Sequence, residues 1–155
     1  MFKRVDANID LPSVESEISA YWDKINAFET SVENRKNDKT FRFYDGPPFP
    51  TGSPHYGNLL AGVIKDIVPR YWTMRGYYVE RRFGWDVHGL PIEMEVQKKL
   101  NLEDPQQIDE YGIDKFNEAC RSQVQTNTEN WEKITRKIGR WVDFENDYKL
   151  SLIHI

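Results

Sequence analysis

Apolar side chains recur every three or four residues along much of this chain, which is the spacing of one face of an α-helix. A first helix is predicted to begin at Asp10, which can cap it, and to continue through Pro12 to Ile25. We expect its apolar face to pack against the outside of the main fold. That face consists of Val14, Ile18, Tyr21, Trp22 and Ile25.

A longer helical pattern covers residues 56–75. Pro69 falls inside it and predicts a kink or a break, and Gly76 predicts its end. The side of this helix expected to be buried consists of Leu59, Leu60, Val63, Ile64, Ile67 and Val68.

Three more helices are predicted in the second half of the chain. One begins at Pro91, and a short one runs from Asp104-Pro105 to Gly112. A long one is capped by Asp114 and is interrupted or ended by Gly139. The apolar face of the long helix carries Phe116, Cys120, Val124, Trp131, Ile134 and Ile138.

Two segments are predicted to be strands, Phe41–Tyr44 and Tyr77–Phe83, and residues 141–148 to form a loop with a short strand. Strand, helix and strand at this spacing form a βαβ unit, with parallel pairing and a right-handed crossover. The fold class is therefore α/β. Ligands of open parallel sheets bind outside the carboxyl ends of the strands, so the loops at 45–54 and 84–91 are expected to form one site.

The loop at 45–54 contains proline at positions 47, 48, 50 and 54 and glycine at 46 and 52, so it suits neither a helix nor the interior of a sheet. The following helix begins at His55, Gly57 and Asn58. A helix N-terminus favours anions because its N–H groups are unpaired, and His55 and Asn58 can add hydrogen bonds to phosphate oxygens. The stretch is therefore interpreted as a phosphate-binding site.

The composition is that of a folded domain: 39% of the 155 residues are hydrophobic and 30% are charged. The net charge of −4 indicates no general affinity for nucleic acid. A single cysteine, Cys120, permits neither a disulfide framework nor a zinc site built from cysteines, and is expected in the core. Arg81 and Arg82 are expected to be solvated charges at a strand end. The absence of a long apolar run argues against a membrane span, and a cytoplasmic location is expected.

The residues Pro-x-x-x-Gly-x-x-His-Tyr-Gly-Asn, ending at Asn58, resemble the HIGH signature of class I aminoacyl-tRNA synthetases. The stretch from Gly84 to Glu93, Gly-Trp-Asp-Val-His-Gly-Leu-Pro-Ile-Glu, is similar to the one that marks the isoleucyl branch, the isoleucine–tRNA ligases. The resemblance covers residues 11–149. One position departs from it, since Asn58 stands where the family usually has histidine.

The resemblance implies the first half of a Rossmann-like nucleotide-binding domain at 41–149, preceded by a helical extension at 1–40. It implies ATP with Mg²⁺, isoleucine and tRNA(Ile) as ligands of the complete enzyme, which is expected to be a monomer. His55 and Asn58 would be catalytic, and Asp86 would pair with the α-ammonium group. The implied ATP-binding residues are Pro48, Gly52, His55, Gly57 and Asn58, and the implied amino-acid-binding residues are Pro47, Trp85, Asp86 and His88.

For Trp85 and His88, packing and loop bracing are alternatives to substrate contact. Residues 150–155 do not continue the resemblance and are expected to be a non-native tail. We expect the chain alone to be inactive and prone to aggregate. Alternatives to the isoleucyl assignment are a valyl or leucyl relative, a small nucleotidylyltransferase of the same fold, and a truncated paralogue that acts as a binding module.

Overall fold

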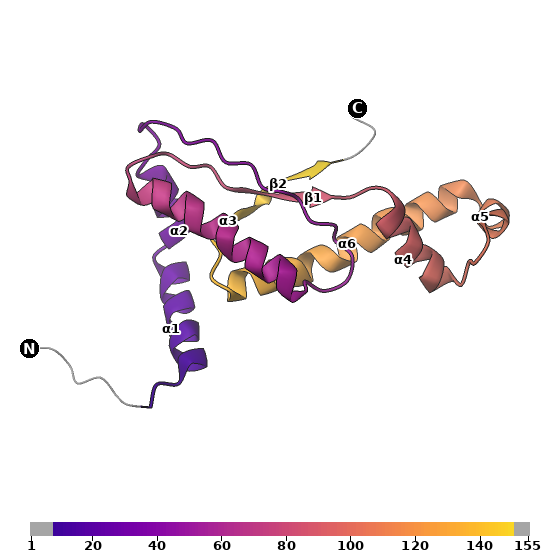
Figure 1. Ribbon diagram of the computed structural model, residues 1–155, viewed down its shortest axis with the longest axis horizontal. Helices are drawn as coiled ribbons and strands as arrows, with labels where there is room; N and C mark the ends of the chain where they lie inside the picture. Colours follow the sequence, from indigo (N-terminus) through magenta and orange to yellow (C-terminus); the bar gives the residue numbers. More distant parts are fainter. Residues whose placement is uncertain (1–7, 151–155) are drawn as a thin grey trace, which may run out of the picture.

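The computed structural model describes residues 8–150, apart from the side chains of Gln125 and Thr126 (Figure 1). The elements follow one another as α1 (Leu11–Lys24), α2 (Ala27–Glu33), α3 (Tyr56–Met74), β1 (Arg82–Asp86), α4 (Leu90–Leu100), α5 (Pro105–Tyr111), α6 (Ile113–Lys137) and β2 (Asp143–Leu150). The predicted α/β class is confirmed, with helices in the majority.

The sheet consists of two parallel strands, β1 and β2, with Arg82 opposite Asp143 and Gly84 opposite Tyr148. The connection between them contains α4, α5 and α6, as parallel pairing requires a long crossover. Aromatic side chains fill the core beside this sheet: Phe83 stacks on Phe144, and Trp85 meets Trp131 edge to face. Such contacts stabilise the core beyond simple area burial.

The predicted first strand at residues 41–44 is wrong. This segment has no regular structure, and only an isolated parallel bridge joins Thr40 to Tyr78. Phe41 stacks on Trp72 of α3 instead, with ring centroids 4.8 Å apart. The second predicted strand is displaced, because β1 begins at Arg82 rather than at Tyr77. A strand needs a hydrogen-bonded neighbour, and the proline-rich loop that follows residue 44 cannot extend the pairing.

Helix α3 passes through Pro69 without a break and ends, as predicted, before Gly76, whose φ is 88°. The prediction of its buried side is wrong. Gly62 and Pro69 are its buried residues, and Leu59 is half-buried. The other five are 40–65% exposed: Leu60, Val63, Ile64, Ile67 and Val68. No segment within residues 8–150 covers this face.

Helix α1 has the predicted limits, but Asp10 makes no side-chain cap and no residue of the helix is buried. It extends away from the rest of the molecule in Figure 1. Its contact with the fold is Trp22, which meets Trp141 edge to face at 5.3 Å. The predicted apolar face is therefore mostly exposed.

Helices α4, α5 and α6 are confirmed, with Asp104 capping α5 through a capping box. Gly112 is the N-cap of α6, and Asp114 lies in its first turn, so the predicted cap is corrected by two residues. The short strand predicted within residues 141–148 is confirmed as β2, which runs two residues further and includes Leu150. The rest of the suspected tail, 151–155, lies outside the described residues.

Candidate functional site

The loop that follows the predicted first strand is anchored at Asp45. Its side chain is fully buried and forms ion pairs with Lys65 of α3, at 2.8 Å, and with Arg140, at 2.5 Å. Lys65 also donates a hydrogen bond to the carbonyl of Gly46. Two cations thus share one carboxylate, which leaves a net positive charge beside the loop and favours an anionic ligand there.

Helix α6 holds the remainder of the loop through three side chains. Asn127 Nδ2 donates to the carbonyl of Pro50 at 2.8 Å, and Trp131 Nε1 donates to that of Gly52 at 3.0 Å. Asn130 Nδ2 donates to the hydroxyl of Ser53, also at 3.0 Å. Gly52 has a φ of 62°, a conformation that glycine adopts without strain. The loop is therefore fixed although it has no regular secondary structure.

The N-terminus of α3 is closed by a capping box between His55 and Asn58. The Asn58 backbone N–H donates to Nδ1 of His55 at 3.4 Å, and the His55 backbone N–H donates to Oδ1 of Asn58 at 3.0 Å. Since Nδ1 accepts, the neutral ring carries its proton on Nε2 and can donate it outward. The Asn58 amide nitrogen likewise remains a donor.

Gly57 is required by this cap. A Cβ at this position would lie 2.9 Å from Cε1 of His55, closer than side chains tolerate, and a tight 3.1 Å from its Nδ1. A larger residue would therefore displace the imidazole from the helix end. This gives a structural reason for the glycine between the two predicted phosphate-binding residues.

A pocket of about 140 Å³ lies between the loop, α3 and α6. Pro48 and Asn58 of the predicted site line it, together with the cations Lys65 and Arg140. His55, Gly57 and Asp86 do not line it. The structure thus brings part of the predicted ATP site around one hollow that carries positive charge.

Asp86 ends β1, and its carboxylate is largely buried. Its Oδ1 lies 3.1 Å from Nδ1 of His88, and that same nitrogen lies 3.3 Å from the carbonyl of Leu150. Asp86 Oδ1 is buried and accepts no hydrogen bond from the described residues, so its contact with His88 is one of proximity. His88 thus lies beside Asp86 and the end of β2, and its packing, loop-bracing and substrate-contact roles stay predictions.

The two predicted loops meet at the backbone. The N–H of Asp86 donates to the carbonyl of Pro48 at 2.9 Å, which joins the end of β1 to the proline-rich loop. This contact accords with the expectation that both loops lie at one edge of the fold. A cleft shared by His55 and Asp86 stays a prediction.

Trp85 is only 1% exposed and lies in the hydrophobic core, where its Nε1 donates to Asp147 at 2.8 Å. This position favours packing over substrate contact. Pro47 is half-buried in the loop. Cys120 is also half-buried, and burial followed by the charge of Glu93 raises the pKa of its thiol, which favours a packing role over a nucleophilic one.

Sequence reasoning missed the residues that hold the loop in place. Asp45 directly precedes Gly46-Pro47, and an acidic residue at the start of a glycine- and proline-rich loop is a local signal that could have indicated an anchor for that loop. Arg140, Asn127 and Trp131 lie far away in the sequence, and nothing local to them indicates a contact with the loop. Arg81, expected to be solvated, is buried instead, whereas Arg82 is exposed and pairs with Glu80.

Among residues 8–150, no three His, Cys, Asp or Glu side chains are grouped so as to hold a metal ion. None of the helices in this part of the chain is long and apolar enough to cross a membrane.

The solved structure of a related fold supports this architecture. A structure described as "the ternary complex of Agrobacterium radiobacter K84 agnB2 LeuRS-tRNA-LeuAMS" superposes with a TM-score of 0.67. The match covers 92% of this chain and 16% of that one at 20% identity, so it concerns the fold alone.

Similar sequences are named isoleucine–tRNA ligase. The protein from Treponema denticola is 50% identical over 149 residues, which is 96% of this chain and 14% of that protein. The cytoplasmic protein from Saccharomyces cerevisiae is 51% identical over 93% of this chain and 13% of its own length. The protein from Mycobacterium tuberculosis is 54% identical over 90% of this chain and 13% of its own. The chain therefore spans about one seventh of these relatives.

The family model described as "tRNA synthetases class I (I, L, M and V)" matches residues 17–152, which is most of the sequence. The relatives that share about half of their residues with this chain agree with this match, and so does the geometry of the loop and helix. The chain belongs to the class I tRNA synthetases.

Proposed function

We propose that this chain is the N-terminal part of an isoleucine–tRNA ligase, in which it supplies half of the site that activates isoleucine with ATP. The observation that carries the proposal is the identity of about half of all residues, over nine tenths or more of the chain, with isoleucine–tRNA ligases of three distant organisms. In this proposal residues 1–40 form a helical extension, and residues 41–149 are the first half of the catalytic domain.

The proposed first step is attack of the isoleucine carboxylate on the α-phosphorus of ATP, with release of pyrophosphate. ATP enters with its magnesium ion. His55 Nε2 and the Asn58 amide donate to phosphate oxygens, where negative charge increases in the transition state. The ion pairs of Asp45 with Lys65 and Arg140 support this role, because they fix the loop and leave positive charge beside it.

Asp86 is proposed to pair with the α-ammonium group of isoleucine. A zwitterionic substrate needs such a counter-charge, and hydrogen bonds between charged groups are the stronger ones. The bond from Asp86 N–H to the Pro48 carbonyl supports this arrangement, since it ties the carboxylate's strand to the phosphate-binding loop. Pro47 and Pro48 are proposed to offer rigid apolar surface and backbone contacts to the substrates.

The second step, transfer of the aminoacyl group to the terminal ribose of tRNA(Ile), is proposed for the full-length protein. That protein is expected to be a cytoplasmic monomer. The chain of 155 residues is expected to be inactive by itself, since it provides only part of the proposed site.

The decisive experiment uses the full-length protein and measures isoleucine-dependent exchange of pyrophosphate into ATP. Asp86→Asn keeps the shape of the side chain but removes its charge. We expect the KM for isoleucine to rise about 10- to 100-fold, the worth of one charge-assisted hydrogen bond, and the KM for ATP to change little. Asp109→Asn, at an exposed position of α5, is the control. An unchanged KM for isoleucine in Asp86→Asn would refute the role of Asp86, and stronger activation of another amino acid by the unaltered enzyme would refute the proposed substrate.

A further inference from the structure

Arg81 is a buried cation whose hydrogen-bonding capacity is only partly used. Its side chain lies between α2 and α3, and the residue is 3% exposed. Nη2 donates to Thr73 Oγ1 and to the carbonyl of Pro69. Nε and Nη1 are buried and have no hydrogen-bond partner among the described residues. Buried donors without partners are rare because each loses its bonds to water.

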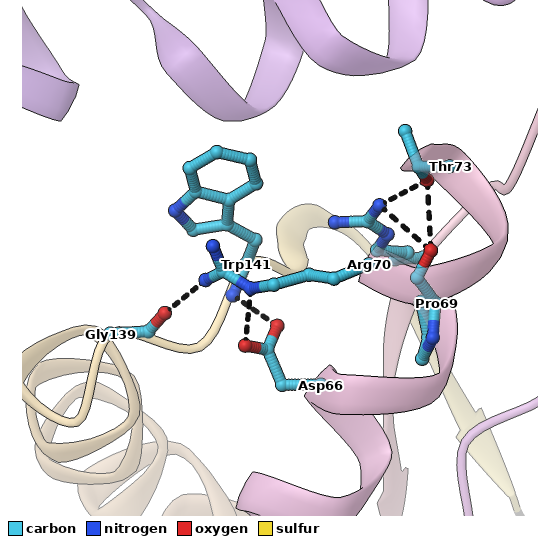
Figure 2. A network of polar contacts seen from close by, with 7 residues as sticks. Asp66, Pro69, Arg70, Thr73, Gly139 and Trp141 are labelled. Carbon is cyan, nitrogen blue, oxygen red and sulfur yellow. Dashed lines mark hydrogen bonds and ion pairs between the residues drawn. The ribbon is translucent and has the colours of Figure 1, made fainter. Parts of the chain in front are cut away.

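The charge of Arg81 also lacks a counter-ion, unlike those of its neighbours. Arg70 is paired with Asp66, donates to the carbonyl of Gly139 and stacks on Trp141 (Figure 2). Arg35 is paired with Asp38 at 3.3 Å. Arg81 forms no ion pair with any residue in the described part of the chain, and its guanidinium lies over the ring of Phe28.

The ionisation of Arg81 reflects this position. Burial lowers the pKa of its guanidinium to about 10. The negative charge of Asp66 opposes this shift by raising the pKa, and the positive charge of Arg70 adds to it by lowering the pKa further. A guanidinium is ordinarily charged under all conditions, so burial without a counter-charge is costly here. An anion close to Arg81 would offset that cost.

Arg81 borders a hollow of about 330 Å³. The lining includes three arginines and no acidic residue: Ser31, Asn34, Arg35, Arg70, Thr73, Met74, Arg81 and Trp141. Amide and guanidinium groups, which this lining contains, are donors that proteins use for phosphate and carboxylate. The hollow shares no lining residue with the pocket beside the proline-rich loop.

We propose that this hollow binds an oxyanion, a phosphate or carboxylate group, with Arg81 as its principal counter-charge. Arg35 and Arg70 also border the hollow, but each is paired with an aspartate, so Arg81 carries the uncompensated charge. Asn34 adds a side-chain amide, whereas the hydroxyls of Ser31 and Thr73 already donate to the carbonyls of Phe28 and Pro69. The volume admits more than a single ion, so the group can be the end of a larger molecule or of a side chain. The inference does not depend on the proposed function.

Inorganic phosphate is the probe that tests the site on the purified 155-residue chain, at a protein concentration below that at which the exposed face of α3 causes self-association. Thermal unfolding is followed as phosphate replaces chloride at constant ionic strength, and ³¹P line widths report binding directly. We expect a saturable rise in the unfolding temperature with phosphate, because a ligand of the folded state alone stabilises it. Acetate should compete for the site. Absence of any saturable phosphate effect overturns the proposal.

Two variants locate the effect. Arg81→Met should weaken phosphate binding about tenfold or more, the loss expected for one charge-assisted hydrogen bond, whereas Arg82→Met, at an exposed position of β1, should leave it unchanged. If Arg81→Met does not fold, Arg35→Met removes a lining cation from the exposed side and should weaken binding severalfold. Equal phosphate binding by the wild type and whichever variant folds would assign the effect to another site and overturn the proposal.

The same titration on the full-length protein distinguishes two sources of the oxyanion. Phosphate binding that persists there, and that Arg81→Met removes, supports a free phosphate-containing ligand. Phosphate binding present in the short chain and lost in the full-length protein supports a carboxylate from the remaining sequence that occupies the hollow. Because the readout is binding and stability, it is independent of isoleucine activation.

Discussion

The carboxylate of Asp45 and the guanidinium of Arg140 form a buried ion pair across 95 residues of sequence, with 0% and 6% of their side chains exposed. The pair joins the start of the proline-rich loop to the segment between α6 and β2. Tyr148 of β2 adds a second link, because its hydroxyl donates to the backbone carbonyl of Asp45. The position of the proposed phosphate-binding loop is therefore set by residues at the far end of the chain.

Loss of one member of this pair should destabilise the fold strongly. Arg140→Met leaves the buried carboxylate of Asp45 with Lys65 alone. We expect a loss of about 3 kcal/mol in the free energy of unfolding, near the lower end for breaking a buried pair because Lys65 remains. Urea denaturation of the purified chain measures it. The control is Arg136→Met, which breaks an exposed pair with Glu132 and should cost less than about 1 kcal/mol. Similar losses in the two variants would contradict this account.

Gly84 is needed for the position of Tyr148. A Cβ on Gly84 would overlap the tyrosine ring and lie 2.7 Å from its Cε1. Gly84→Ala should therefore cost about 1–3 kcal/mol, as overpacking of a core does. Gly46→Ala is a suitable comparison, because its Cβ would meet Lys65 Nζ at an ordinary 3.6 Å. Adding Tyr148→Ala should remove most of the penalty at Gly84, and if the penalty were unchanged, contact with Tyr148 would not be its cause.

Tyr148 should also give the stability a specific dependence on alkaline pH. Burial, and then the charge of Asp45, raise the pKa of its phenol above the ordinary value of 10.0. The unfolded chain therefore releases this proton at lower pH than the folded one. The resulting stabilisation is complete below pH 10 and is lost as the pH rises through the folded pKa. Ultraviolet titration of the phenolate should show one late-titrating tyrosine, absent in Tyr148→Phe. Between pH 10 and the folded pKa, the free energy of unfolding should fall less in Tyr148→Phe than in the wild type. If it falls equally with pH in both proteins, Tyr148 is not the source of this pH dependence.

The helices could be predicted because their signals are local. Asp104-Pro105 and Gly112 define α5 by themselves, and Gly76 ends α3 whatever lies around it. The strand predicted at residues 41–44 failed because aromatic residues are equally suited to stacking on a helix, as Phe41 does on Trp72. Whether such a segment becomes a strand depends on a neighbour that the local sequence does not contain.

The candidate site was only partly predictable for the same reason. His55, Gly57 and Asn58 form a local motif, and the structure supplies a physical role for each in the helix cap. Arg140 and Trp131 act across long distances in the sequence, so no spacing rule identifies them. The burial of Arg81 could not be predicted from the sequence either, because a charged residue at a strand end is normally solvated.

The capping box predicts a measurable role for the side chain of Asn58 in the full-length enzyme. Asn58→Ala removes the acceptor for the His55 backbone N–H and one proposed donor to phosphate. We expect a loss of about 1 kcal/mol in stability, typical of a cap, and a rise in the KM for ATP in pyrophosphate exchange. Asn130→Ala removes a loop contact outside the cap and serves as the comparison. A normal KM for ATP in Asn58→Ala would show that its amide does not bind the nucleotide.

The uncovered apolar face of α3 should make the isolated chain self-associate. Ile64 and Ile67 are 55% and 58% exposed and lie beside Leu60, Val63 and Val68 on one continuous face, and such patches promote aggregation. Ile64→Lys and Ile67→Lys together should keep the chain monomeric at concentrations where the wild type scatters light. Because both positions are exposed, the free energy of unfolding should change by only about 0.5 kcal/mol per site. Val79→Lys, at a position 1% exposed, should instead unfold the chain. If the double variant aggregates as readily as the wild type, association occurs through another surface, such as the edges of the two-stranded sheet.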